Sequence, residues 1–139
     1  MEQRPKAASR ALSASRVVTL GRMVGRPMLL RAGIAGVLEV PGRRTGKVVR
    51  VTLAPLAVEG NLYLMSQYGV TAWVRNLRAS GRGKLRYKGD DQAFRAIEVE
   101  GDERDRVIAF FRSKADGLLR RDFDRLQAAD HPTFRVEPI

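Results

Sequence analysis

Short β-rich segments separated by tight turns constrain the fold of this chain more than any other feature. Residues 37–40, 48–58 and 62–66 are three such segments, and the Glu-Gly-Asn turn at 59–61 joins the last two. Pro55 lies inside the second segment and predicts an edge strand or a bulge, because proline cannot donate a hydrogen bond to a strand ladder. The pattern predicts a meander of antiparallel strands.

The second half of the chain mixes helices with further strands. Apolar spacing predicts helices over residues 71–80, 102–114 and 118–128, with Thr71 and Asp102 as N-caps. Further strands are expected over 84–88, 92–100 and 133–138. The connections lack the regular alternation of a parallel sheet. The sequence therefore predicts an α+β, mainly β fold: an antiparallel barrel of about six strands with flanking short helices.

The N-terminal residues form a separate region of different character. From about residue 11 to residue 25, apolar side chains share one helical face, arginines lie largely off it, and Pro27 ends the pattern. Such a helix packs on the domain or contacts an anionic bilayer, and its composition also fits a transit peptide. We divide the chain into a tail with a basic amphipathic helix (1–30) and a barrel domain (31–139).

Composition limits the chemistry. Cysteine is absent and His131 is the only histidine, which excludes disulfides and thiolate chemistry and argues against a protein-built metal site. No run of 18 apolar residues is present to span a bilayer. The formal net charge of +11 attracts anions such as nucleic acid, an acidic membrane surface or a phosphorylated cofactor.

Side chains that could form an active site by themselves are scarce. His131 precedes a proline, and nothing in the sequence places it beside a nucleophile, which argues against a Ser-His-Asp hydrolase. Asp122 and Asp124 lie among arginines and are expected to be solvated ion partners. No phosphate-binding loop motif of the P-loop or dinucleotide type is present. No catalytic residue or metal ligand is therefore predicted, and an enzyme of this sequence would need a bound cofactor to carry the reaction.

Two polar clusters stand out. The first, "GRRTGK" at residues 42–47, places Arg43, Arg44 and Lys47 on a tight turn, with Arg50 on the following strand. It is either a solvated hairpin tip or an anion-binding group of guanidinium side chains.

The second cluster is "QYGVTAWVRN" at residues 67–76. Gln67, Tyr68 and Gly69 come just before a predicted helix N-terminus, where anions and polar ring edges bind readily. The alternative is a plain strand-to-helix corner in which Trp73 anchors the core.

Both clusters, in this order, resemble the deazaflavin-dependent nitroreductase family of the flavin/deazaflavin oxidoreductases. The matching pieces lie within residues 20–139: "GRRTG" (42–46), Arg50, "YG" (68–69), "AWVRNLRASG" (72–81) and "EP" (137–138). The resemblance implies a split β-barrel of the FMN-binding type that binds coenzyme F420, a deazaflavin with a phospholactate and oligoglutamate tail. It also implies hydride transfer from the reduced coenzyme to a quinone or nitroaromatic acceptor.

The resemblance further implies roles for individual residues. Arg43, Arg44 and Arg50 would hold the phosphate and the tail carboxylates. The deazaflavin ring would lie along Met65, Gln67, Tyr68 and Gly69, and Trp73 and Asn76 would order the helix that closes the site. Barrels of this type often pair, so a homodimer is expected. The family occurs mostly in actinobacteria, which argues against a transit peptide and implies a cytoplasmic location, with membrane contact at the inner face through the N-terminal helix.

One departure from the family concerns the acceptor pocket. Members of the family line it with tyrosines from the C-terminal helical region, but "ADGLLRRDFDRLQAADH" (115–131) contains none. Phe123 is expected to occupy one such place, with Gly117 and Arg120 at others. Cofactor binding is therefore better supported than reduction of quinones or nitroaromatics.

Other functions compete with a reductase. The chain would be a cofactor-binding protein without turnover, or an enzyme that uses FMN on the same barrel. A nucleic-acid binder fits the charge, but the few aromatic residues argue against it because the core needs several of them.

Overall fold

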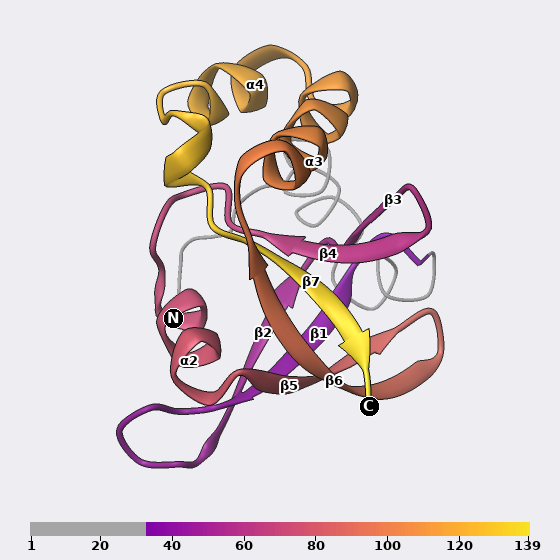
Figure 1. Ribbon diagram of the computed structural model, residues 1–139, viewed down its shortest axis with the longest axis vertical. Coiled ribbons are helices and arrows are strands. Elements are labelled where there is room, and N and C mark those ends of the chain that lie inside the picture. Colours follow the sequence, from indigo (N-terminus) through magenta and orange to yellow (C-terminus); the bar gives the residue numbers. More distant parts are fainter. Residues whose placement is uncertain (1–32) are drawn as a thin grey trace.

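The computed structural model describes residues 33–139, and the tail and amphipathic helix expected over 1–30 lie outside these residues. The described part is one antiparallel sheet that curls around a core, with helices against it (Figure 1). None of the helices in residues 33–139 has the length and apolar character needed to cross a bilayer.

The sheet has seven strands in the order β2-β1-β5-β6-β7-β4-β3, and all neighbours are antiparallel. The strands are β1 (Gly36–Pro41), β2 (Val48–Leu53), β3 (Leu56–Val58), β4 (Asn61–Met65), β5 (Arg82–Tyr87), β6 (Asp90–Val99) and β7 (Thr133–Pro138). This confirms the mainly β, antiparallel architecture. The expected single strand over 48–58 is in fact two strands, which gives one strand more than predicted.

Pro55 causes this division and with it the curl of the sheet. The edge strands β2 and β3 are at opposite ends of the strand order, yet only Ala54 and Pro55 separate them along the chain. Three residue steps span at most about 10 Å. The two edges must therefore approach each other at this point, which a flat sheet of seven strands cannot allow. Pro55 is buried at this junction, where its missing amide proton costs no ladder hydrogen bond.

The helices are placed close to their predicted positions. The described part contains α2 (Ala72–Ser80), α3 (Gly101–Lys114), α4 (Gly117–Phe123) and a short 3₁₀ turn, η1 (Ala128–Asp130). Glu100, rather than Asp102, occupies the N-cap position of α3. The last helix ends at Phe123, whereas the prediction extended it to residue 128. The next residue, Asp124, accepts two hydrogen bonds from the Arg112 guanidinium, at 2.9 and 3.1 Å.

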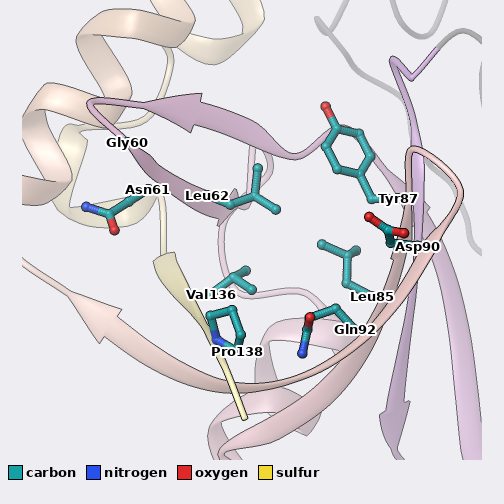
Figure 2. A pocket seen from close by; sticks show the side chains of 9 residues that line it. All are labelled: Gly60, Asn61, Leu62, Leu85, Tyr87, Asp90, Gln92, Val136 and Pro138. Carbon is teal, nitrogen blue, oxygen red and sulfur yellow. The ribbon is translucent and has the colours of Figure 1, made fainter.

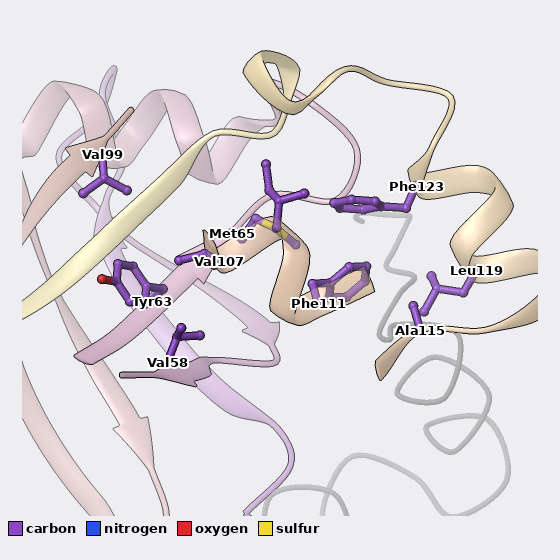
Figure 3. Close-up of a cluster of buried hydrophobic side chains, with 10 residues drawn as sticks. Val58, Tyr63, Met65, Val99, Val107, Phe111, Ala115, Leu119 and Phe123 are labelled. Atoms are coloured by element: carbon purple, nitrogen blue, oxygen red, sulfur yellow. The ribbon is translucent and has the colours of Figure 1, made fainter. Parts of the chain in front are cut away.

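Two apolar clusters fill the structure. One lies inside the curled sheet beneath α2 and centres on Leu38, Phe94 and Phe134. The other joins β4 to α3 and α4 and includes Met65, Phe111 and Phe123 (Figure 3). Burying a side chain such as leucine or phenylalanine contributes about 1.5–3 kcal/mol, so these clusters fix the helical region on the sheet.

His131 is completely buried beside the second cluster. Its ring stacks on Phe123, with centroids 3.8 Å apart and an interplanar angle of 8°. Burial lowers the pKa of the imidazole below its ordinary value of 6.5, although hydrogen bonds to the Ser66 and Phe123 carbonyls and the charge of Asp130 oppose this shift.

We expect this histidine to make stability depend on pH. The unfolded chain takes up a proton as the pH falls through 6.5, but the folded chain does so only at a lower pH, so the free energy of unfolding decreases between these two values. Asp124 and Glu103 change the stability in a different, more acidic pH range. Ion pairs with Arg112 and Arg135 lower the pKa values of these two carboxyl groups, so the stabilisation that they contribute is lost only in stronger acid.

Thermal unfolding measured across this range for the wild type and for His131→Phe tests the assignment. The variant should lose the decline that begins just below pH 6.5 and keep the steeper one in stronger acid. Parallel curves for the two proteins above about pH 5 would contradict it.

Candidate functional site

The turn between β1 and β2 is held in a defined shape by its own backbone. The Gly42 amide donates to the Lys47 carbonyl and the Gly46 amide donates to the Gly42 carbonyl, both at 2.8 Å. Gly46 has φ +77°, a conformation that favours glycine. The Lys47 amide also donates to Thr45 Oγ1 at 3.2 Å. Figure 1 shows this turn projecting from the sheet near α2.

Asn76 on α2 fastens the turn to the body of the protein. The Arg43 backbone amide and its Nη1 atom both donate to Asn76 Oδ1, at 3.1 and 2.8 Å. The Asn76 side chain is buried at 4% exposure, so its oxygen is a fixed acceptor. Asn76 was expected to order the helix that closes the site, and in the structure it also accepts hydrogen bonds from the arginine turn.

The remaining cations of the turn face solvent. Arg44 and Lys47 are exposed, and neither forms an ion pair with a carboxylate within the described residues. Arg50 differs, because its Nε donates to Glu39 Oε2 at 2.9 Å across the β1–β2 pair. An exposed pair of this kind is weak, so the Arg50 guanidinium can exchange partners. Glu39 was not predicted, because the strand register that places it opposite Arg50 is not visible in the sequence.

The segment from Ser66 to Thr71 connects β4 to α2 and forms the second cluster. The Ser66 hydroxyl donates to the Gly69 carbonyl, and Gly69 has φ +85°. Tyr68 and Val70 are exposed at 42% and 44%. The segment therefore presents an aromatic ring and an apolar side chain at the surface.

Two buried polar atoms in this segment have no partner within residues 33–139. They are Gln67 Oε1 and Thr71 Oγ1. Thr71 occupies the N-cap position of α2 as predicted, but its hydroxyl makes no capping hydrogen bond. An α-helix leaves the amides of its first turn without partners inside the helix, so the start of α2 and these two oxygens are candidate hydrogen-bonding groups for a polar ligand.

Helix α2 connects the two clusters. The helix starts directly after Thr71, and Asn76 holds Arg43 one turn further along. Four residues of α-helix span about 6 Å, so the start of α2 and the arginine turn lie close enough for one elongated ligand to reach both.

The other predicted site residues pack in the core or against it. Met65 and Phe123 belong to the same apolar cluster, at 9% and 2% exposure (Figure 3). Trp73 is half-buried and contacts Phe134, with ring centroids 6.0 Å apart. Met65, which was predicted to lie along the ring, and Phe123, which was predicted for the acceptor pocket, therefore belong to one buried cluster.

A separate hollow of about 330 Å³ opens between β4, β5, β6 and β7 (Figure 2). It is lined by Gly60, Asn61, Leu62, Leu85, Tyr87, Asp90, Gln92, Val136 and Pro138. None of the predicted site residues lines this hollow.

The fold is shared with several solved structures. One is an F420H2-dependent reductase, FDR-A, at 21% identity and a TM-score of 0.57, covering 75% of this chain and 94% of that chain. A second, described as a domain-swapped dimer, has 20% identity and a TM-score of 0.58, covering 86% and 98% of the two chains. A third, from Listeria innocua and provisionally named a pyridoxamine 5′-phosphate oxidase, has 12% identity and a TM-score of 0.58, covering 86% and 93%. These similarities show the split-barrel fold.

No curated protein sequence matches the chain significantly. The model of a protein family, the F420H2-dependent quinone reductases, matches residues 10–121 and so includes both polar clusters and α2. Because this match spans most of the chain, the protein belongs to the F420H2-dependent quinone reductase family.

Proposed function

We propose that this protein binds coenzyme F420 with its tail on the β1–β2 turn and its ring on the Ser66–Thr71 segment, and reduces a quinone or a nitroaromatic. The observation that carries the proposal is the Arg43–Asn76 link, which fixes a cation-rich turn beside the middle of α2, one helical turn from the Ser66–Thr71 segment. The reduced coenzyme supplies a hydride, and the protein supplies binding, orientation and charge.

Tail binding follows from the charges of the turn. Arg44 and Lys47 are exposed, Arg43 is oriented by Asn76, and Arg50 lies on the adjacent strand. Guanidinium groups form paired hydrogen bonds with phosphate and carboxylate oxygens, which are the groups of the coenzyme tail. The residues present fit this anion.

Ring binding follows from the second cluster. Gln67 and Thr71 carry buried polar atoms without partners, and rotation of these side chains would present the atoms to a heterocycle with carbonyl and N–H edges. Gly69 offers backbone without a side chain, and Met65 and Phe123 support the segment from the core. Tyr68 and Val70 are the exposed side chains against which an apolar acceptor can pack.

Binding and reduction are tested in one set of experiments. Purified protein is titrated with F420 and, in parallel, with FMN, and oxidation of F420H2 is followed with menadione and with a nitroaromatic. We expect saturable F420 binding and oxidation faster than the uncatalysed background. Binding without acceleration would support the cofactor-binding alternative, and preference for FMN would overturn the choice of cofactor.

A homodimer in the cytoplasm, with contact to the inner membrane face through the basic helix expected from the sequence, completes the proposal. The solved relative described as a domain-swapped dimer supports pairing, as does the exposed edge strand β2, where Val48 and Val49 are 54% and 39% exposed. Light scattering of the full chain measures its mass, and flotation with anionic vesicles measures membrane contact.

Removing charge from the turn should weaken cofactor binding. For Arg43→Ala combined with Arg44→Ala we expect a Kd for F420 at least about tenfold higher, because each charge-assisted hydrogen bond contributes roughly 1.5–3 kcal/mol. Fluorescence titration measures the change. The matched control is Lys88→Ala with Lys114→Ala, which removes two charges from the β5–β6 turn and the end of α3. Equal Kd values for the two double variants would contradict the assigned tail site.

Asn76→Asp separates the geometry of the turn from its charge. The carboxylate still accepts both hydrogen bonds from Arg43 but places a negative charge beside the tail site. We expect the melting temperature to stay near the wild-type value and F420 affinity to fall several-fold, in line with a charge interaction of about 1 kcal/mol.

Asn61→Asp provides the control, since it makes the same change at an exposed position on β4. Unchanged F420 affinity in Asn76→Asp would show that the tail does not lie near Arg43.

A further inference from the structure

His131 lies between the segment proposed to hold the cofactor ring and the end of α4. Its side chain is completely buried, and its ring stacks on Phe123. Its Nδ1 atom is 3.0 Å from the Ser66 carbonyl oxygen, and its Nε2 atom is 3.0 Å from the Phe123 carbonyl oxygen. One side chain thus lies between the segment that follows β4 and the end of α4, which are far apart in sequence.

The imidazole ring can donate a hydrogen bond to only one of these two carbonyls when it is neutral. A neutral imidazole has one N–H donor, whereas both partners here are carbonyl acceptors. The Phe123 carbonyl already accepts the Leu126 amide at 3.3 Å. The Ser66 carbonyl is buried and has the His131 ring as its partner. We adopt the tautomer with the proton on Nδ1, which donates it to the Ser66 carbonyl and leaves Nε2 without a hydrogen bond to the Phe123 carbonyl.

Ser66 passes this restraint on to the proposed ring-binding segment. Its amide donates to the Pro132 carbonyl at 2.8 Å, so its backbone is held on both sides by residues 131 and 132. Its hydroxyl donates to the Gly69 carbonyl. A Cβ atom at Gly69 would lie 3.7 Å from Leu126 Cδ1 and 3.8 Å from the Asp130 carbonyl, which shows that the segment also packs against residues 126–130.

We propose that His131 is a positioning residue: its Nδ1–H donates to the Ser66 carbonyl and, through Ser66 and Gly69, fixes the segment that orients the deazaflavin ring toward the acceptor. This inference rests on the proposed function, because it assumes that the deazaflavin ring binds at this segment. The tail is bound elsewhere, on the β1–β2 turn. Loss of the bridge should therefore impair turnover more than cofactor affinity.

Three substitutions test the proposal. His131→Asn places an amide donor near the position of Nδ1, His131→Gln places one near Nε2, and His131→Phe keeps a ring to stack on Phe123 but donates to neither carbonyl. We expect kcat to fall about 10- to 100-fold in the Phe and Gln variants, the range for a misplaced reactant. The Asn variant should stay near wild type, and the Kd for F420 should change little in all three.

Hydrogen–deuterium exchange on the protein without cofactor gives a readout besides activity. Amides of residues 67–70 should exchange faster in the Phe and Gln variants than in the wild type and the Asn variant, and amides of the β1–β2 turn should not change. If the Phe variant does not fold, the Asn and Gln variants still provide the comparison.

Several outcomes would overturn the proposal. These are rescue by Gln instead of Asn, equal kcat in all variants, a kcat loss matched by an equal loss of F420 affinity, or unchanged exchange at residues 67–70. Absence of F420 binding or turnover in the wild type would instead refute the proposed function, and the exchange measurement would then still decide whether His131 fixes the segment.

Discussion

The bond from Asn76 Oδ1 to the backbone and guanidinium of Arg43 is the interaction on which the arrangement of the site depends. A glycine-bounded turn rich in like charges would otherwise repel itself and sample many positions. A buried amide oxygen supplies an acceptor without adding a negative charge, so the turn is fixed while its attraction for anions is kept. A carboxylate at the same place would fix the turn equally well but would neutralise part of the charge that the proposed tail requires.

The curl of the sheet has a comparably local cause. Because residues 54 and 55 alone connect the two edge strands, the barrel is closed covalently where hydrogen bonding between strands is interrupted. Helix α2 packs against one side of the inner face of the sheet. Its position determines where the Ser66–Thr71 segment and the Asn76 side chain lie. A two-residue connection thus determines where both polar clusters lie in relation to each other.

The sequence predicted most of this fold because its signals are local. Turn residues, alternating strands and the N-cap position of Thr71 depend on neighbours in the chain, and most elements were found close to their expected positions. The exceptions are the segment 48–58, which forms two strands, and the last helix, which ends at Phe123. The strand order, the Glu39–Arg50 register and the bond between Arg43 and Asn76 depend on residues brought together only by the curled sheet, so no pattern in the chain reveals them. His131 was assigned no role for the same reason: its partners lie 65 and 8 residues away.

The proposed function assigns cofactor binding and acceptor choice to different parts of the structure. The groups proposed to bind the anionic tail are on the β1–β2 turn and at the start of α2, whereas the residues behind the proposed ring site belong to an apolar cluster shared by β4, α3 and α4. Phe123 in that cluster is almost fully buried and bears no hydroxyl, so in the proposed site it would act on the acceptor by packing and not by donating a proton. Acceptor selectivity in this chain should therefore depend on how the helical region is held against β4, which is where the buried His131 joins the two.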